Sequence, residues 1–323
     1  MKTRLTLILA LAALLCFEQC KRADDSGKPT IAIVMKTLNN PFFIDMQEGA
    51  QSAAKKLGVE LIIQAAEREV DVEKQMQIVE NLIQRKVSAL CITPSGSREI
   101  VPAILKANEA KIPVLVIDTR VDQKALAEAG ATTVAFIGSD NKDGGRIAGE
   151  FIAGQLGGKG SVAILEGIPG HETGDARLNG FHEAIEKFKG IRIVASQTAN
   201  WERDQGFNVF QNILQAYPGV QAVFACNDMM ALGAVEAISA AQSKHKVIVV
   251  GFDAVDDCRK AILSGEMSAS IAQHPEEMGR LAVEYAYKAM KGEHVPPEIP
   301  VRIELVTKEK LMGEGKSKKG VSE

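Results

Sequence analysis

Short apolar runs alternate with longer amphipathic stretches along most of the chain. In the first half these runs are rich in Ile, Val and Leu, which is typical of strands buried on both faces of a sheet. Between two of them, Val72, Val79 and Leu82 recur at helical spacing within 71–86, which predicts an amphipathic helix. Strands that alternate with helices indicate a parallel sheet covered by helices on both faces. The strands predicted in this half are 31–35, 60–64, 89–92, 114–117 and 133–137.

The second half repeats this pattern. Gly49 and the residues after it are echoed from Gly180 onward, and the run that ends at Asp118 is echoed by the run that ends at Asp253. The sequence therefore predicts an α/β protein with two similar Rossmann-like lobes. The second lobe is expected to contain strands 161–165, 191–195, 222–224, 247–250 and 269–271, and helices 177–188, 204–217 and 229–241.

The boundary between the lobes is predicted in the small, polar and glycine-rich segment 138–145. A helical stretch, 275–291, and a strand-like stretch, 300–306, remain after the second set of strands, so three crossings between the lobes are expected, forming a three-segment hinge. The first lobe would then comprise 28–139 and 274–302, and the second 140–273 and 303–312. The charged and glycine-rich residues 313–323 are expected to form a flexible tail.

The amino terminus differs from the rest of the chain. Lys2 and Arg4 precede an apolar run over 5–15 that is too short to span a bilayer, and this order is typical of an export signal. Residues 1–26 are therefore left out of the fold. Cys20 follows the apolar run and is the predicted site of lipid attachment, which would place the protein in the periplasm or at the cell surface. The alternative is a cleaved leader and a soluble periplasmic protein.

Charge and cysteine usage narrow the range of functions. The formal net charge of −3 and a pI near 6.1 argue against binding to nucleic acid or to an anionic membrane surface. Cys91 lies in a strand-like run and is expected to be a core residue, whereas a disulfide between Cys226 and Cys258 stays open. The cysteines and the scattered histidines have no metal-ligand spacing, so neither a metal nor a cofactor is predicted.

Polar side chains and aromatics follow the predicted strands. The turn 37–43 carries Asn39, Asn40, Phe42 and Phe43, and amides beside aromatic faces suit a polyhydroxylated ring with apolar C–H faces. Since the carboxyl ends of parallel strands are where ligands bind, we expect other strand ends to contribute to the same site. These further candidates are Thr93, Asp118, Thr119, Arg120, Arg177, Trp201, Asn227, Asp228, Asp253 and Gln273.

Each candidate also has an interpretation without a ligand. Phe42 and Phe43 could be core residues, since phenylalanine is usually buried. Asp118 and Asp253 could cap helices, and Arg177 could form a surface ion pair. The shared position at strand ends favours a binding site.

At these residues the chain resembles the ribose-binding branch of the periplasmic sugar-binding proteins, the receptors of ABC importers, which have the type I periplasmic binding protein fold. The resemblance extends from Lys28 to about Lys308. It rests on the turn 37–43 and on the motifs at 138–145, 223–233, 249–253 and 270–273.

The resemblance implies a monomeric, non-enzymatic receptor that captures a monosaccharide, such as ribose or a related sugar, by hinge closure and delivers it to a permease. Thr93 stands where asparagine is usual in the ribose-binding branch. Thr119 stands where arginine is usual, with Arg120 one place later. Thr93, Thr119 and Arg120 are therefore secondary candidates, and Asn39 is a further one. The contacts that the resemblance implies are Asn40, Phe42, Phe43, Asp118, Arg177, Trp201, Asn227, Asp253 and Gln273.

Other classes of protein fit the sequence less well. An enzyme on a dinucleotide-binding fold would need a G-x-G-x-x-G motif after the first strand, and this motif is absent there. A transcriptional repressor would carry a helix-turn-helix where the export signal stands. A sugar sensor or chemoreceptor that does not transport its ligand remains an alternative that the sequence does not distinguish.

Overall fold

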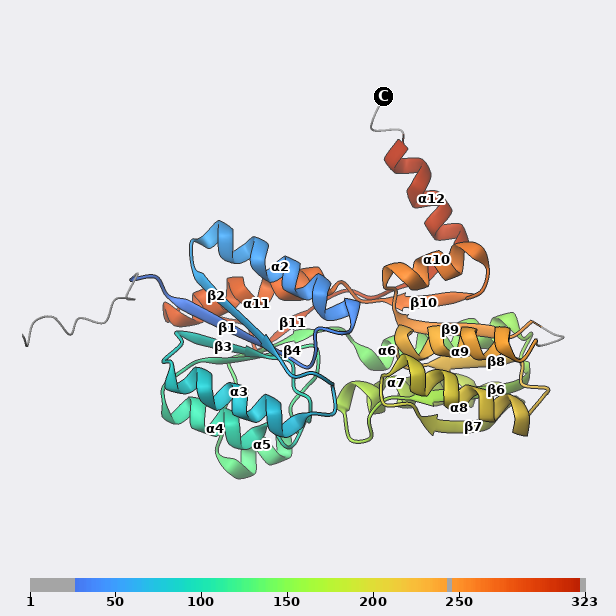
Figure 1. Ribbon diagram of the computed structural model, residues 1–323, viewed down its shortest axis with the longest axis horizontal. Coiled ribbons are helices and arrows are strands. Elements are labelled where there is room, and N and C mark those ends of the chain that lie inside the picture. The colour runs from blue at the N-terminus through green and yellow to red at the C-terminus, as the bar shows by residue number, and fades with distance from the viewer. Residues whose placement is uncertain (1–26, 243–245, 320–323) are drawn as a thin grey trace, which may run out of the picture.

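The computed structural model describes residues 27–242 and 246–319, which form two α/β lobes lying side by side (Figure 1). The predicted export signal with Cys20 lies outside the described residues. Each lobe contains one six-stranded sheet. This arrangement is the one expected for the type I periplasmic binding protein fold that the resemblance implied. Within the described ranges, no helix combines the length and the apolar character needed to cross a membrane.

The first sheet consists of β1 (Thr30–Met35), β2 (Glu60–Ala65), β3 (Ala89–Ile92), β4 (Val114–Ile117), β5 (Ala135–Gly138) and β11 (Glu298–Pro300). Its strands are all parallel, in the order β11-β5-β4-β3-β1-β2. Side chains alternate between its faces: Ile31 and Ile33 belong to one apolar cluster, and Ala32 and Val34 to another. Helices cover both faces of this sheet, which explains why its strands are apolar throughout. One face is covered by α2 (Pro41–Leu57) and α11 (Pro275–Met290). The other face is covered by α3 (Val72–Gln84), α4 (Val101–Glu109) and α5 (Gln123–Ala129).

The second sheet has the order β12-β10-β9-β8-β6-β7, in which only the pair β10 and β12 is antiparallel. Its strands are β6 (Lys159–Glu166), β7 (Gly190–Thr198), β8 (Ala222–Ala225), β9 (Ile248–Asp253), β10 (Ala269–Ala272) and β12 (Glu304–Thr307). The helices of this lobe are α6 (Asn141–Gln155), α7 (Glu172–Ile185), α8 (Arg203–Ala216), α9 (Asp228–Ala240), α10 (Asp256–Ser264) and α12 (Lys308–Lys319).

Glycines let paired helices approach closely in both lobes. A Cβ atom on Gly49 of α2 would lie 1.9 Å from the Glu276 carbonyl oxygen of α11, and one on Gly180 of α7 would lie 1.9 Å from the Lys142 carbonyl oxygen of α6. Gly49 and Gly180 occupy matching positions in the internal repeat of the sequence. The repeat therefore reflects a shared need for close helix contact.

The strands predicted in the two repeats are all present, with ends that differ by a few residues, and the chain passes between the sheets three times. The predicted boundary 138–145 was too long, because Asp140 caps α6 by accepting a hydrogen bond from the Asp143 amide. The strand predicted over 300–306 is instead two strands, β11 and β12, in different sheets.

Two helices also differ from the prediction. Helix α7 begins at Glu172, with Glu172 and Asp175 in its first turn, so Arg177 lies inside the helix and does not open it. The tail predicted from 313 is helical as far as Lys319 in α12, which projects from its lobe (Figure 1). Leu311 packs against the core at the start of this helix. Residues 320–323 lie outside the described part of the chain.

Candidate sugar-binding site

A small cavity lies between the lobes, where strand ends of both sheets face each other. The cavity brings together the nine contacts that the resemblance implied. Its lining consists of Lys36, Asn40, Phe42, Phe43, Glu69, Asp118, Thr173, Arg177, Trp201, Asn227, Asp253 and Gln273.

The turn after β1 supplies aromatic rings and an amide. Asn40 caps α2, since its side-chain oxygen accepts a hydrogen bond from the Phe42 amide at 3.1 Å, and Pro41 begins the helix. The rings of Phe42 and Phe43 meet edge to face with centroids 5.3 Å apart, and both are buried. Asn40 therefore caps the helix, and Phe42 and Phe43 are core residues as well as cavity residues. The cap and the packing fix the two rings at the cavity.

A buried group of opposite charges lies beside these rings. The Lys36 ammonium is 3.5 Å from an Asp118 carboxylate oxygen and 3.9 Å from a Glu69 carboxylate oxygen. Burial raises the pKa of Glu69, while Lys36 and the Asn40 amide act against this shift. Lys36 and Glu69 were missed by sequence reasoning. Their only signal was that each closely follows a strand, β1 or β2.

In the second lobe, Arg177 is held in place from several sides. Its Nε donates to Asn141 Oδ1 at 2.9 Å, and its Nη1 donates to the Cys226 carbonyl oxygen at 2.6 Å. The guanidinium carbon lies 3.7 Å from the centroid of the Phe252 ring, and Nη1 is 3.9 Å from Asp253 Oδ1. The interpretation of Arg177 as a surface ion pair was wrong, because its side chain is buried.

Asp118 and Asp253 end corresponding strands in the two lobes and share an unusual backbone. Their φ angles are 62° and 117°, in the region that favours glycine. Neither residue caps a helix, because the caps of α5 and α10 are Asp122 and Val255. Asp253 accepts a hydrogen bond from Gln273 Nε2 at 2.8 Å, and burial raises its pKa well above the ordinary value. Strained residues of this kind are concentrated at functional sites.

Polar atoms without partners face the same cavity. Thr173 Oγ1 and Gln273 Oε1 are buried and make no hydrogen bond to any residue that the structure describes. Buried polar groups are normally paired, so these two atoms indicate that a polar ligand completes their bonding. The Asn227 side chain, in contrast, has partners within the protein: Nδ2 donates to the Trp201 carbonyl oxygen, and Oδ1 accepts from the Met230 amide. Thr173 was missed because it lies inside α7.

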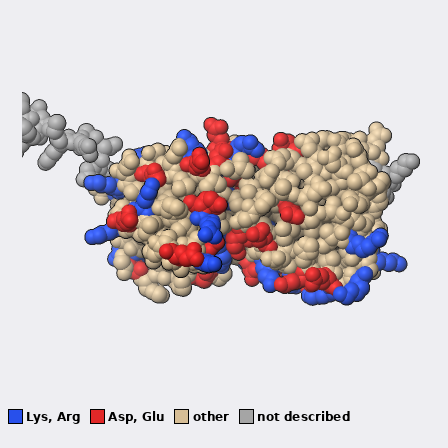
Figure 2. Space-filling model, turned by 90° about the horizontal axis from the view of Figure 1, so that it is seen from below, with Lys and Arg blue, Asp and Glu red and all other residues tan. Residues whose placement is uncertain are grey.

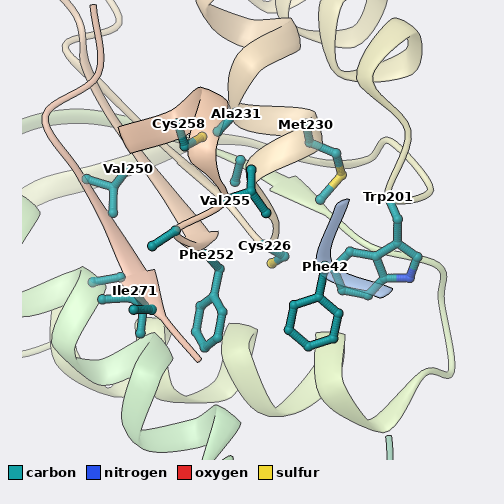
Figure 3. Close-up of a cluster of buried hydrophobic side chains, with 14 of the residues drawn as sticks. Phe42, Trp201, Cys226, Met230, Ala231, Val250, Phe252, Val255, Cys258 and Ile271 are labelled. Atoms are coloured by element: carbon teal, nitrogen blue, oxygen red, sulfur yellow. The ribbon is translucent and has the colours of Figure 1, made fainter. Parts of the chain in front are cut away.

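Aromatic side chains of the two lobes meet across the cavity. Figure 3 shows the Phe42 ring beside the Trp201 indole, with the Phe252 ring on the other side of Phe42. Trp201 is almost fully buried, with 5% of its surface exposed. A ligand ring with apolar C–H faces could therefore pack on these aromatic side chains.

The secondary candidates lie outside the cavity lining. Arg120 forms two hydrogen bonds to the Glu298 carboxylate, at 2.7 and 2.8 Å, and stacks on Phe136. Thr119 Oγ1 donates to Asp118, and Thr93 Oγ1 donates to a carbonyl of β1. Asn39 binds the Glu67 carbonyl oxygen. Their side chains are engaged within the first lobe.

The three cysteines among the described residues are free thiols. Cys91, Cys226 and Cys258 are all buried, and Cys226 is not joined to Cys258. Cys91 is a core residue, as predicted.

Asp228, just behind the cavity, is expected to make stability depend on pH. Its carboxylate accepts hydrogen bonds from Ser270 Oγ and the Val255 amide, yet burial raises its pKa from 3.8 to about 6. Between these values the folded protein binds more protons than the unfolded chain, so the free energy of unfolding falls as pH rises through this window. Urea unfolding at pH 4 and pH 7 should show a smaller decrease for Asp228→Asn than for the wild type.

The exposed Asp257 is a control with the opposite sign. Lys260 lowers the pKa of Asp257, so this carboxylate contributes stability that is lost as pH falls. Asp257→Asn should not reduce the decrease between pH 4 and pH 7. Equal pH dependence of the wild type and Asp228→Asn would contradict the assignment to Asp228.

Comparison with known proteins gives consistent results. Residues 31–294 match the family model described as a periplasmic binding protein domain. The ribose import binding protein of Salmonella typhimurium is 40% identical over 96% of this chain and 99% of that protein. The D-allose-binding periplasmic protein of Escherichia coli is 37% identical over 82% of this chain and 86% of that protein. A solute-binding protein of Actinobacillus succinogenes, solved with bound D-allose, is 41% identical over 88% of this chain and all of that chain, with a TM-score of 0.84.

Proposed function

The chain belongs to the periplasmic binding protein domain family, and we propose that it is an extracytoplasmic receptor that captures a monosaccharide and delivers it to the permease of an ABC importer. The observation that carries the proposal is the interlobe cavity, which has polar groups and aromatic faces from both lobes. Thr173 Oγ1 and Gln273 Oε1, which have no hydrogen-bond partner in the described part of the chain, add support. We propose that it binds its solute without chemical conversion.

Capture would occur by closure of the lobes. A ligand in the cavity contacts both lobes only when they are together, so binding shifts the population toward the closed form. Contacts between the lobes add to this preference: Arg68 Nε lies 3.3 Å from Glu202 Oε1, and the Glu172 amide donates to Ser97 Oγ at 3.3 Å. The chain crossings near Ser139, Gln273 and Arg302 would serve as hinges.

The polar groups suit a neutral sugar, because one carboxylate or guanidinium group can bind two hydroxyls of a sugar ring. Arg177 is a donor, the carboxylates of Asp118 and Asp253 are acceptors, and Gln273 offers a free carbonyl oxygen. We propose D-allose or D-ribose, whose pyranose rings share the configuration of their hydroxyls and differ only in the hydroxymethyl group of allose. The relatives that bind these sugars support the choice. Lys36 and Glu69 would provide partners for a further hydroxyl.

Calorimetric titration with a panel of sugars tests this proposal. We expect D-allose and D-ribose to bind, and D-glucose, the C3 epimer of D-allose, to bind roughly 100-fold more weakly because a misplaced hydroxyl leaves buried polar groups unpaired. D-Arabinose, the C2 epimer of D-ribose, provides the matching comparison for the pentose. No heat with any sugar would rule out the proposed function, and equal binding of both epimers would rule out this choice of sugar.

The permease would recognise the closed form through surfaces of both lobes. On the face drawn in Figure 2, acidic and basic side chains are mixed over the first lobe, whereas on the second lobe they gather mainly along its lower edge. This distribution favours recognition by the matching of individual charges and by the relative position of the lobes. We propose that the receptor acts as a monomer in the periplasm or at the cell surface.

A further inference from the structure

Trp201 is held in one orientation by the residues around it. Its φ angle of 66° is unusual for a large side chain, and its ring lies against two glycines. A Cβ atom on Gly167 would lie 1.9 Å from the indole, and one on Gly174 would lie 3.2 Å from it. These glycines leave the space that the indole occupies. They do not provide a partner for its N–H group.

His171 provides that partner. The Trp201 indole nitrogen donates to His171 Nδ1 at 3.2 Å, and the ring planes differ by 30° with centroids 6.4 Å apart. An indole nitrogen can only donate, so Nδ1 must be the unprotonated nitrogen of the imidazole. Burial, with a further effect of the Lys36 charge, lowers the pKa of His171 to about 3, so the ring is neutral at ordinary pH.

His171 also lies where the two lobes meet. It precedes α7 of the second lobe, and the next amide, that of Glu172, donates to Ser97 Oγ of the first lobe at 3.3 Å. Lys36 and the Ser95 backbone, also of the first lobe, are close enough to influence its pKa. Only 3% of His171 is exposed. Its surroundings are therefore completed by residues of the opposite lobe.

We propose that His171 is a positioning residue that fixes the Trp201 indole when the lobes close, and that it thereby determines which sugars the cavity accepts. This inference rests on the proposed sugar-binding function. Without the acceptor, the buried indole N–H would be unsatisfied, and the ring would turn toward another partner. A turned ring would change the shape of the cavity where it meets one face of the sugar.

The test uses the full chain and the variant His171→Leu, which retains an apolar side chain of moderate size but has no acceptor. By calorimetry we expect about tenfold weaker binding of D-allose, as estimated for a buried donor left unpaired. The preference for D-allose over D-glucose should also decrease. His171→Asn, whose side-chain oxygen can replace Nδ1, should restore part of both.

Fluorescence gives a second readout, because Trp201 is the only tryptophan in the chain. With saturating D-allose, acrylamide should quench the emission of His171→Leu more strongly than that of the wild type. His182→Leu is the matched control, since it removes a histidine inside α7 that does not line the cavity. It should leave both affinity and quenching unchanged.

A double-mutant cycle with Trp201→Phe separates this role from a general structural effect. Phenylalanine has no N–H group, so His171→Leu should have little further effect on affinity in that background. An equal loss in both backgrounds would overturn the inference, as would unchanged affinity and sugar preference in His171→Leu. A wild type that binds no sugar would overturn the proposed function and this inference with it, and the wild-type titration alone identifies that outcome.

Discussion

Arg177→Met is expected to weaken sugar binding by about 100-fold or more, as is typical when one member of a buried hydrogen-bonded charge pair is removed. The variant loses the donor of the second lobe and leaves the buried Asp253 carboxylate without its nearby cation. It also removes the bonds to Asn141 and Cys226 and the stacking on Phe252. We therefore expect the free energy of unfolding to fall by ~3 kcal/mol. Calorimetry and urea unfolding measure the two effects.

Matched variants show which property of Arg177 matters. Arg146→Met on the adjacent helix α6 removes an exposed arginine paired with Asp143 and Glu150, so it should change stability by less than about 1 kcal/mol and leave binding intact. Arg177→Lys keeps the charge but lacks the planar fork, and it should bind sugar with intermediate affinity. Unchanged affinity in Arg177→Met would remove this residue from the site.

Most of the residues that line the cavity could be predicted from the sequence, because their positions follow from one simple rule. Parallel strands end at one edge of a sheet, so residues such as Asp118 and Asp253 could be located once the apolar runs were recognised. The internal repeat placed them at matching positions in two lobes. The same rule explains why the turn after β1 contributes aromatic rings to the cavity.

The residues that were missed depend on partners far away in the chain. Lys36 and Glu69 are charged residues in loops, which are usually exposed. Both are buried here, where Lys36 pairs with the Glu69 and Asp118 carboxylates. Arg120 shows the opposite case. It follows a site residue but pairs with Glu298, on a strand that returns from the other end of the chain. Sequence spacing alone carries no information about such pairs.

Trp201 was predicted at the site, but the sequence did not show the orientation of its indole, because this depends on space that a glycine leaves free. This dependence leads to a prediction for Gly167→Ala. The new Cβ atom would lie 1.9 Å from the indole carbon Cζ2, a distance that no packing allows. The ring must therefore move. We expect roughly 10- to 100-fold weaker sugar binding, as estimated from the cost of overpacking, and a shift in the emission of the only tryptophan.

Two comparisons test whether the indole is the cause. Gly154→Ala lies in helix α6, where a Cβ atom meets nothing within 4 Å, so it should leave binding unchanged and stabilise the helix slightly. Trp201→Ala removes the ring that Gly167→Ala displaces, so Gly167→Ala should weaken sugar binding little further in that background. Full sugar affinity in Gly167→Ala would show that the cavity does not depend on the orientation of the indole, because the ring has no room to keep its place.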